Sequence, residues 1–407
     1  MLSNSRFITD LLEVSPESAA WLGSSKSLQP LGYEALWGEI SSKLKRNLGP
    51  DQAIRLIRVI RRREILRIAL ADGAAVIDQD TVGRALADND RAAVRGALEV
   101  AQRTEYAATP QLGEFLVMAM GRQGGHEIGY CSDADVMFVQ RAFDEADQQG
   151  AQEQAMRIAT ALGSLLGRPM VPAIQAEPRL EIDAALRPEG KSGPLVRSLA
   201  SYEEYYRRWS QIWEQQALLR ATPMAGSEEL AADFMAMIDP LRYEQVMGEE
   251  QIREIRRIKA RVEAERLPRG AEPERHLKLG RGSLSDVEWL VQLMQLSHAK
   301  DHPALRTTST RPALAAIAEA GIIPAEDVAL LDHAWSLATR IRSAGLICTG
   351  RVSDVLPNSW RDMEAVARWC GYAPGEASVM EDDYLKATRR ARQVFERYFY
   401  GFEDRSA

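Results

Sequence analysis

Hydrophobic positions near the start of the chain recur with helical spacing. Ile54, Ile57 and Ile60 lie three residues apart, the period that places apolar side chains on one face of an α-helix. Similar patterns predict helices through most of residues 1–108. The same segment carries a group of basic residues, which are Arg61, Arg62, Arg63 and Arg67. They could bind phosphate, but their interleaving with Glu64 favours a solvated helix face.

The pattern changes at about residue 109. The short apolar run Phe115–Met120 predicts a buried strand, and Ala134–Val139 predicts a second. Residues 145–167 have a helical pattern, and the alternation in Leu180–Leu186 predicts a third strand. From about residue 198 to the end, amphipathic patterns return, and prolines separate them into helices.

These patterns predict an α+β protein in three parts. A helical region covers residues 1–108, a small α+β domain covers 109–225, and a helical bundle covers 226–407. The 407 residues exceed what one hydrophobic core usually organises, about 250–300. We expect the chemistry in the middle part.

Composition narrows the class of function. A net charge of −7 disfavours a surface devoted to nucleic acid. The three cysteines have no spacing typical of a zinc site or a disulfide framework, so we expect a reducing cytoplasm. No stretch approaches the roughly 18–20 apolar residues of a membrane-spanning helix, and the N-terminus lacks a secretion signal. We therefore expect a cytoplasmic protein with no membrane partner.

Acidic residues mark the strands of the middle part. Asp133 and Asp135 are two apart, so on a strand their carboxylates share one face. Magnesium prefers such oxygen ligands and is commonly shared between carboxylates and substrate phosphates. Asp183 lies in the third strand and would face the same site if the strands are neighbours. Three acids could hold two metal ions, one on the leaving pyrophosphate and one on the nucleophile.

Glycine and basic residues surround these acids. Gly121, Gly124 and Gly125 would let a turn approach phosphate oxygens closely, and Arg122 could add charge. After the third acid, Arg187 and Lys191 could bind a triphosphate, or they could be loop residues with no role in binding. A structural interpretation is also open, in which the acids are a strand cap and an edge charge and the glycines form a hairpin turn. The order of strand, glycine turn, paired acids and later acid favours catalysis.

Together these segments resemble the bacterial glutamine synthetase adenylyltransferases, members of the DNA-polymerase-β-like nucleotidyltransferase superfamily. The resemblance covers nearly the whole chain and runs through Met120–Val139, Ile182–Gly190, Trp213–Arg220, Lys278–Gln292 and Leu305–Thr310. It implies a polymerase-β-like core that transfers AMP from ATP to a tyrosine hydroxyl of glutamine synthetase. It also implies Mg²⁺, with two ions expected, and a PII-type nitrogen-signalling protein as a further candidate partner.

Residue by residue, the resemblance makes Asp133 and Asp135 the metal pair and Asp183 the third acid. It makes Gly124 and Gly125 the phosphate loop, and we count Ser132 among the nucleotide contacts. The family's enzymes look like two fused halves, one attaching AMP and one removing it. Only one half is present here.

The form of one downstream segment, Asp286-Val-Glu288, is similar to the attaching, C-terminal half. Asp286 and Glu288 could act near the active site, or Ser285 and Glu288 could form a helix capping box. In place of the family's usual glycine pair, the chain has Gly282-Ser283. This departure raises the question of how tightly that turn packs.

Three aromatic residues precede this segment at a spacing of four, namely Tyr205, Trp209 and Trp213. The spacing favours a helix stripe packed on the core over a base-stacking surface. Adenine could still use one of them.

Three other functions remain as alternatives. A uridylyltransferase acting on a nitrogen-signalling protein would share the site and a similar helical region, but its hydrolytic and ligand-sensing domains are absent from these residues. An RNA-extending enzyme is disfavoured by the acidic net charge. A regulatory half that binds glutamine synthetase without catalysis is disfavoured by the intact acids.

Overall fold

The computed structural model describes residues 4–46 and 48–402. They divide into two compact units, Asp10–Asp239 and a second that joins residues 240–402 to residues 4–9. In these ranges, no helix is both long and apolar enough to cross a membrane. All three cysteines are free thiols.

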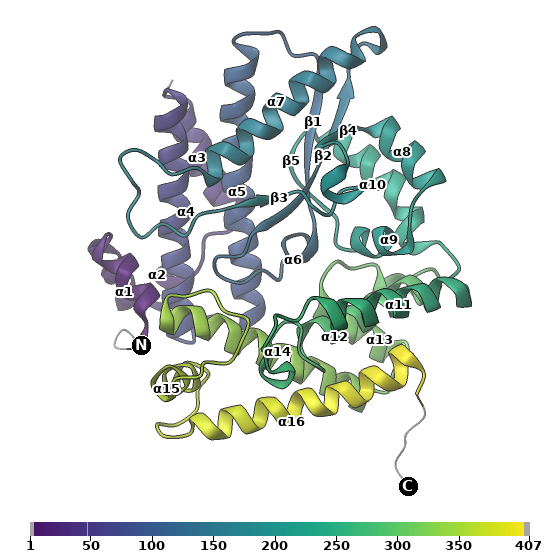
Figure 1. Ribbon diagram of the computed structural model, residues 1–407. Helices are drawn as coiled ribbons and strands as arrows, with labels where there is room; N and C mark the ends of the chain where they lie inside the picture. Colours follow the sequence, from purple (N-terminus) through teal and green to yellow (C-terminus); the bar gives the residue numbers. More distant parts are fainter. Residues whose placement is uncertain (1–3, 47, 403–407) are drawn as a thin grey trace. The chain divides into compact units, whose positions relative to one another are not determined.

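The first unit begins with helices, as the periodicity predicts. They are α1 (Arg6–Glu13), whose first four residues are assigned to the second unit, α2 (Ser25–Leu28), α3 (Tyr33–Leu44), α4 (Pro50–Gly73) and α5 (Gln79–Tyr106). The last two are long and lie side by side (Figure 1). Asp78 caps α5 by accepting a hydrogen bond of 2.8 Å from the backbone N–H of Thr81, which satisfies one of the donors left over at a helix start.

The arginine-rich face of α4 is not solvated, so that prediction is wrong. Arg61 is buried and forms an ion pair of 2.5 Å with the equally buried Asp90. One turn away, Arg58 donates to a carboxylate oxygen of Glu177 at 2.8 Å. Glu64 is fully buried, and burial raises the pKa of its carboxyl. Charged side chains tolerate such burial when each finds an opposite charge, and the helix period alone does not reveal those partners.

Among the described residues, the sheet of this unit has five strands. They are β1 (Gly113–Ala119), β2 (Ala134–Ala142), β3 (Ile182–Asp183), β4 (Val196–Ser198) and β5 (Thr222–Gly226). The order is β3-β2-β1-β5, and β4 also pairs with β2. β1 is antiparallel to β2 and β5, whereas β3 and β4 run parallel to β2. The sheet is therefore mixed.

The first two predicted strands and the predicted helix are confirmed, the helix as α7 (Gln148–Gly167). The third predicted strand is reduced to the two residues of β3. β5 was not predicted, because a short segment that contains Pro223 carries no clear alternation. It instead gains its hydrogen bonds as an edge strand beside β1.

The two faces of the sheet have different roles. Phe115, Val117, Val136 and Phe138 lie in the hydrophobic core with residues of α3, α4, α5 and α7. Side chains alternate along a strand, so Asp135 points to the opposite face. That side of the unit is completed by α8 (Leu199–Arg208), α9 (Ile212–Leu218) and α10 (Glu228–Tyr243) (Figure 1).

The second unit is helical. It contains α11 (Glu249–Glu265), α12 (Leu284–His298), α13 (Thr310–Glu319), α14 (Ala325–Thr349), α15 (Trp360–Trp369) and α16 (Ala377–Phe395). The fold is thus mixed α and β, with one small sheet and mostly helices. The domain boundaries at 108/109 and 225/226 stay predictions, and the N-terminal helices share one core with the sheet.

Candidate active site

A tight glycine turn follows β1, and its residues form the four-residue helix α6 (Gly121–Gly124). Gly121 has a φ of +53°, and a Cβ there would lie 2.4 Å from Asp135 Oδ2. A Cβ on Gly124 would lie 1.8 Å from the carbonyl oxygen of Arg220. Both positions therefore need glycine, for backbone conformation at the first and for close approach at the second. The turn places its backbone directly beside the Asp135 carboxylate.

The polar side chains around this turn brace it. Arg122 Nε donates to the carbonyl of Glu127 at 2.9 Å. Ser132 Oγ accepts a hydrogen bond of 3.2 Å from the Gly129 backbone N–H. Both contacts fix the connection between β1 and β2. Whether Arg122, Ser132 or Gly125 also contacts a nucleotide stays a prediction.

Two residues of this region were not picked out from the sequence. Arg220 and Glu127 form a buried ion pair at 3.4 Å, with side chains only 6% and 9% exposed. The pair ties the segment after α9 to the glycine turn. The sequence pointed to them only in that they lie in two segments of the family resemblance, Met120–Val139 and Trp213–Arg220. A long-range ion pair leaves no periodic pattern in the sequence.

The three predicted acids lie at one end of β2. Asp133 is exposed and directly precedes the strand. Asp135 and Asp183 are register partners across the parallel β2–β3 pair, so their side chains leave the sheet on the same face. Asp183 Oδ1 accepts a hydrogen bond of 2.8 Å from the Ala185 backbone N–H. The condition set on Asp183, that its strand neighbours the strand of the paired acids, is met by β3 beside β2.

Whether the three acids are arranged to bind a metal ion is a separate question. In residues 4–46 and 48–402, no three His, Cys, Asp or Glu side chains converge as a metal-binding group. The chemistry of the donor set still fits a hard cation, since paired carboxylate oxygens are what Mg²⁺ prefers. A metal site at Asp133, Asp135 and Asp183 therefore stays a prediction.

The loop that follows Asp183 is organised by Arg187. This side chain is buried, and it donates to the carbonyl oxygens of Ala184 at 2.6 Å and Gly193 at 3.1 Å. A further donation reaches Lys191 O at 3.2 Å. The Arg187 guanidinium thus shapes the loop from inside, while the Lys191 side chain is exposed. Triphosphate binding by either residue stays a prediction.

The expected aromatic stripe is not a single helix face. α8 ends at Arg208, so Trp209 lies beyond it, and Trp213 belongs to α9. The Trp209 side chain is 69% exposed. The prediction of a stripe packed on the core is therefore wrong, because the helix breaks between the first and last of the three aromatic residues.

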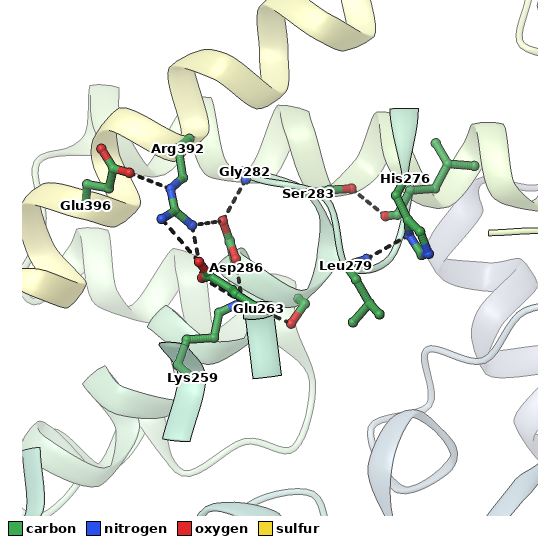
Figure 2. A network of polar contacts seen from close by, with 11 residues as sticks. Lys259, Glu263, His276, Leu279, Gly282, Ser283, Asp286, Arg392 and Glu396 are labelled. Atoms are coloured by element: carbon green, nitrogen blue, oxygen red, sulfur yellow. Dashed lines mark hydrogen bonds and ion pairs between the residues drawn. The ribbon is translucent and has the colours of Figure 1, made fainter. Parts of the chain in front are cut away.

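In the helical unit, Asp286 is the centre of an ion network (Figure 2). Its carboxylate lies 2.6 Å from Lys259 Nζ and 2.8 Å from the Arg392 guanidinium, and it accepts from the Gly282 backbone N–H at 2.6 Å. Glu263 lies 3.2 Å from the same lysine. The network fastens the start of α12 to α11 and α16.

The Ser285–Glu288 capping box does not form, because α12 begins two residues earlier than the box requires, with Ser283 as its N-cap. Glu288 instead accepts a hydrogen bond of 3.3 Å from Trp335 Nε1. A role for Asp286 and Glu288 near the active site stays a prediction.

The Gly282-Ser283 turn packs tightly. Gly282 has a φ of +72°, and a Cβ there would lie 1.8 Å from the carbonyl oxygen of Thr388. Ser283 is fully buried, and its hydroxyl donates to the Leu277 carbonyl and accepts from Tyr384 Oη at 3.2 Å. The serine thus finds partners for its hydroxyl, and the departure from a glycine pair does not loosen the turn.

Comparison with known proteins gives two family matches. Residues 1–237 match the glutamate-ammonia ligase adenylyltransferase family, and residues 251–399 match the GlnD PII-uridylyltransferase family. The first match contains the glycine turn and all three acids. The second covers most of the helical unit, which agrees with the expectation that both kinds of enzyme share a similar helical region.

Curated relatives align over almost the whole chain. A bifunctional glutamine synthetase adenylyltransferase/adenylyl-removing enzyme of Streptomyces avermitilis is 48% identical over 98% of this chain and 41% of its own length. Enzymes with the same description from Leifsonia xyli and Mycobacterium avium are 48% and 44% identical, over 100% and 98% of this chain and 39% and 40% of their own. The chain thus spans about two fifths of the relatives it matches.

Proposed function

Because the chain belongs to the glutamate-ammonia ligase adenylyltransferase family, we propose that it transfers AMP from ATP to a tyrosine hydroxyl of glutamine synthetase, with release of pyrophosphate. The observation that carries the proposal is the register of Asp135 opposite Asp183, directly beside the glycine turn. A small mixed sheet with two acids on adjacent strands is consistent with a polymerase-β-like core. Transfer to glutamine synthetase would down-regulate nitrogen assimilation in the cytoplasm.

The acids would hold magnesium, with two ions in the arrangement we propose. Asp133 and Asp135 would hold the ion on the triphosphate, and Asp183 would share the ion near the nucleophile. Bound there, magnesium would neutralise the charge that develops on the phosphoryl and pyrophosphate oxygens. The carboxylates provide the hard oxygen ligands that this ion requires.

The glycine turn would position the α-phosphate for attack. The amides of Gly124 and Gly125 already donate within the turn, to the carbonyl oxygens of Met120 at 2.9 Å and Gly121 at 3.1 Å. These two glycines would therefore act by keeping the turn compact beside the phosphate, since neither carries a side chain. The tyrosine oxygen forms a bond to the α-phosphorus as the bond to the pyrophosphate oxygen breaks. With the attacking oxygen, the α-phosphorus and the leaving oxygen in line, positioning and electrostatics supply most of the rate acceleration.

The phenol must also lose its proton. An unperturbed tyrosine has a pKa of about 10 and is mostly protonated at neutral pH. Asp183 Oδ1 is engaged by the Ala185 N–H, so we assign Oδ2 as the acceptor of the proton. A carboxylate placed within reach of the reacting hydroxyl is a suitable general base.

The bifunctional relatives contain an attaching half and a removing half, and we also propose which of the two this chain represents. We assign it to the attaching half, on the form of the Asp286-Val-Glu288 segment. Partners beyond glutamine synthetase, including a PII-type protein, follow from the family alone. No surface in the described residues identifies them.

The proposal is tested by incubating the chain with α-labelled ATP, Mg²⁺ and glutamine synthetase. We expect the synthetase to become labelled and the double variant Asp133→Asn, Asp135→Asn to leave it unlabelled. Equal labelling by the double variant would contradict the proposed mechanism. UTP with a PII-type protein, and RNA as acceptor, test the uridylyl and RNA-extending alternatives in the same assay. A wild-type chain that binds the synthetase but never labels it would instead favour the non-catalytic regulatory half.

A further inference from the structure

A pocket separate from the three acids lies in the same compact unit. It is formed by the loop after Asp183, by β4 and by the region from α8 to the start of α9, and its volume is about 550 Å³. Residues lining it include Glu189, Arg197, Glu204, Tyr205 and Trp209. Pockets of roughly 300–1,000 Å³ hold small ligands and cofactors. This one has the size of a small-molecule site, too small for a folded partner.

Trp209 provides an aromatic surface at this pocket. Trp209 lies directly after the end of α8, and its side chain is 69% exposed. Packing in a hydrophobic core therefore does not explain why so large an aromatic residue stands here. A single exposed aromatic residue is ordinary on a protein surface. At the wall of a pocket, however, it offers a flat face on which a nucleobase can stack, an interaction that every base can make.

The charges of the pocket disfavour phosphate. Arg197 forms an ion pair with Glu189, and it donates to Ser201 Oγ at 3.3 Å. Its positive charge is therefore already compensated, and Glu204, whose carboxylate also lines the pocket, is paired with Arg208 at 2.9 Å. Carboxylates accept hydrogen bonds and repel phosphates, so they suit amino and hydroxyl donors on a neutral group. The lining matches a nucleoside better than a triphosphate.

The other aromatic wall is fixed in place. Tyr205 Oη donates a hydrogen bond of 2.9 Å to Glu214 Oε1, and the Arg197 guanidinium lies 5.2 Å from the tyrosine ring centre. Burial and the bond to Glu214 raise the pKa of this phenol to about 12. The ring is thus neutral at physiological pH, and both contacts restrict its movement.

Strand register connects the pocket to the acids. Arg197 is the partner of Val139 in the parallel β2–β4 pair, and Val139 has the same orientation on β2 as Asp135. Arg197 therefore leaves the sheet on the face that carries the acids. Four residues of strand separate the two positions, roughly 13 Å at about 3.3 Å per residue. Glu189 belongs to the loop that begins directly after Asp183.

We propose that this pocket holds the adenosine end of the nucleotide, with Trp209 stacked on the adenine, while the glycine turn and the acids hold the phosphates. Carboxylates of Glu189 and Glu204 would accept hydrogen bonds from the base or the ribose. This inference rests on the proposed function, since it takes ATP as the substrate. It assigns nucleotide positioning to Trp209, which the sequence pattern placed in the core.

The test compares Trp209→Ala with a matched control, Trp360→Ala. Trp360 is similarly exposed, at 62%, and belongs to the helical unit. ATP binding is measured by equilibrium dialysis, and the KM and kcat for ATP by labelling of glutamine synthetase. For Trp209→Ala we expect the dissociation constant and KM to rise by on the order of tenfold with kcat little changed. Trp209→Phe should recover most of the affinity, and Trp360→Ala should match the wild type.

The two proposals fail in different ways. If wild-type and Trp209→Ala proteins bind ATP equally, the pocket assignment is overturned while transfer can stand. If the wild-type chain binds ATP with the expected Trp209 dependence but labels no glutamine synthetase, the pocket assignment stands and the proposed transfer is overturned. A wild-type chain that binds no ATP would overturn both.

Discussion

Each compact unit contains a group of acidic residues, and the two groups differ in what neutralises them. Asp286 of the helical unit is 1% exposed and lies within 2.6 Å of Lys259 and 2.8 Å of Arg392. In the sheet-containing unit, Asp133 is exposed and Asp183 accepts a backbone N–H. Within the described part of the chain, neither of these two pairs with a lysine or arginine.

This difference separates structural acids from candidate catalytic ones. A buried carboxylate with two cations holds helices together, and it has little capacity left for a ligand. Carboxylates that have no protein cation beside them, as at Asp133 and Asp183 among the described residues, can take an external one. An Asp-x-Asp pattern or an Asp-x-Glu pattern does not distinguish these cases, whereas the charges around each side chain do.

The largest expected effect is on the sheet acids. Asp183→Asn removes the proposed proton acceptor and one metal ligand, so we expect AMP transfer to fall by at least about 1,000-fold, more than about 4 kcal/mol of transition-state stabilisation. Because the side chain is only partly buried, the melting temperature should hardly change. Initial labelling rates and a thermal melt measure the two quantities. A loss below tenfold would contradict the assigned role.

The next effect is on stability rather than on the chemical step. Asp286→Asn leaves the buried Lys259 and the partly buried Arg392 beside a neutral group, and we expect the free energy of unfolding to fall by about 3 kcal/mol. Glu263 stays within 3.2 Å of the lysine, which limits the loss. Urea unfolding measures it. The double variant Lys259→Met, Asp286→Leu should recover much of the stability. If Asp286→Asn lowers the free energy of unfolding by less than about 1 kcal/mol, the network does not stabilise the fold.

A smaller effect is expected at the glycine turn. Gly121→Ala would place a Cβ 2.4 Å from Asp135 Oδ2 at a φ of +53°, so the carboxylate must shift. We expect activity to fall roughly 10- to 100-fold and stability to fall by about 1–2 kcal/mol.

The matched control for this variant is Gly270→Ala. Gly270 also has a positive φ, +81°, but a Cβ there would meet nothing within 4 Å. It should cost about 1 kcal/mol of stability from backbone strain alone and leave the rate of transfer unchanged. Equal activity losses in both variants would mean that Gly121 does not act through Asp135.

Much of the fold could be predicted from the sequence, because β1, β2 and the long helices have strong periodic patterns. β3 and β5 could not be delimited, since strands of two and five residues depend on a neighbouring strand for their hydrogen bonds. The pairing of Asp135 with Asp183 could be stated only as a condition on strand order. The buried arginines of α4 and the exposed Trp209 were misjudged because both depend on tertiary partners or on where a helix ends.

The most direct test of the central claim is intact mass spectrometry of the glutamine synthetase subunit after incubation with ATP and Mg²⁺. With the wild-type chain, the account predicts that the subunit gains the mass of one adenylyl group, located on a tyrosine by peptide analysis. With Asp135→Asn, it predicts an unmodified subunit. An unmodified subunit with the wild-type chain, or equal modification by both proteins, would contradict it.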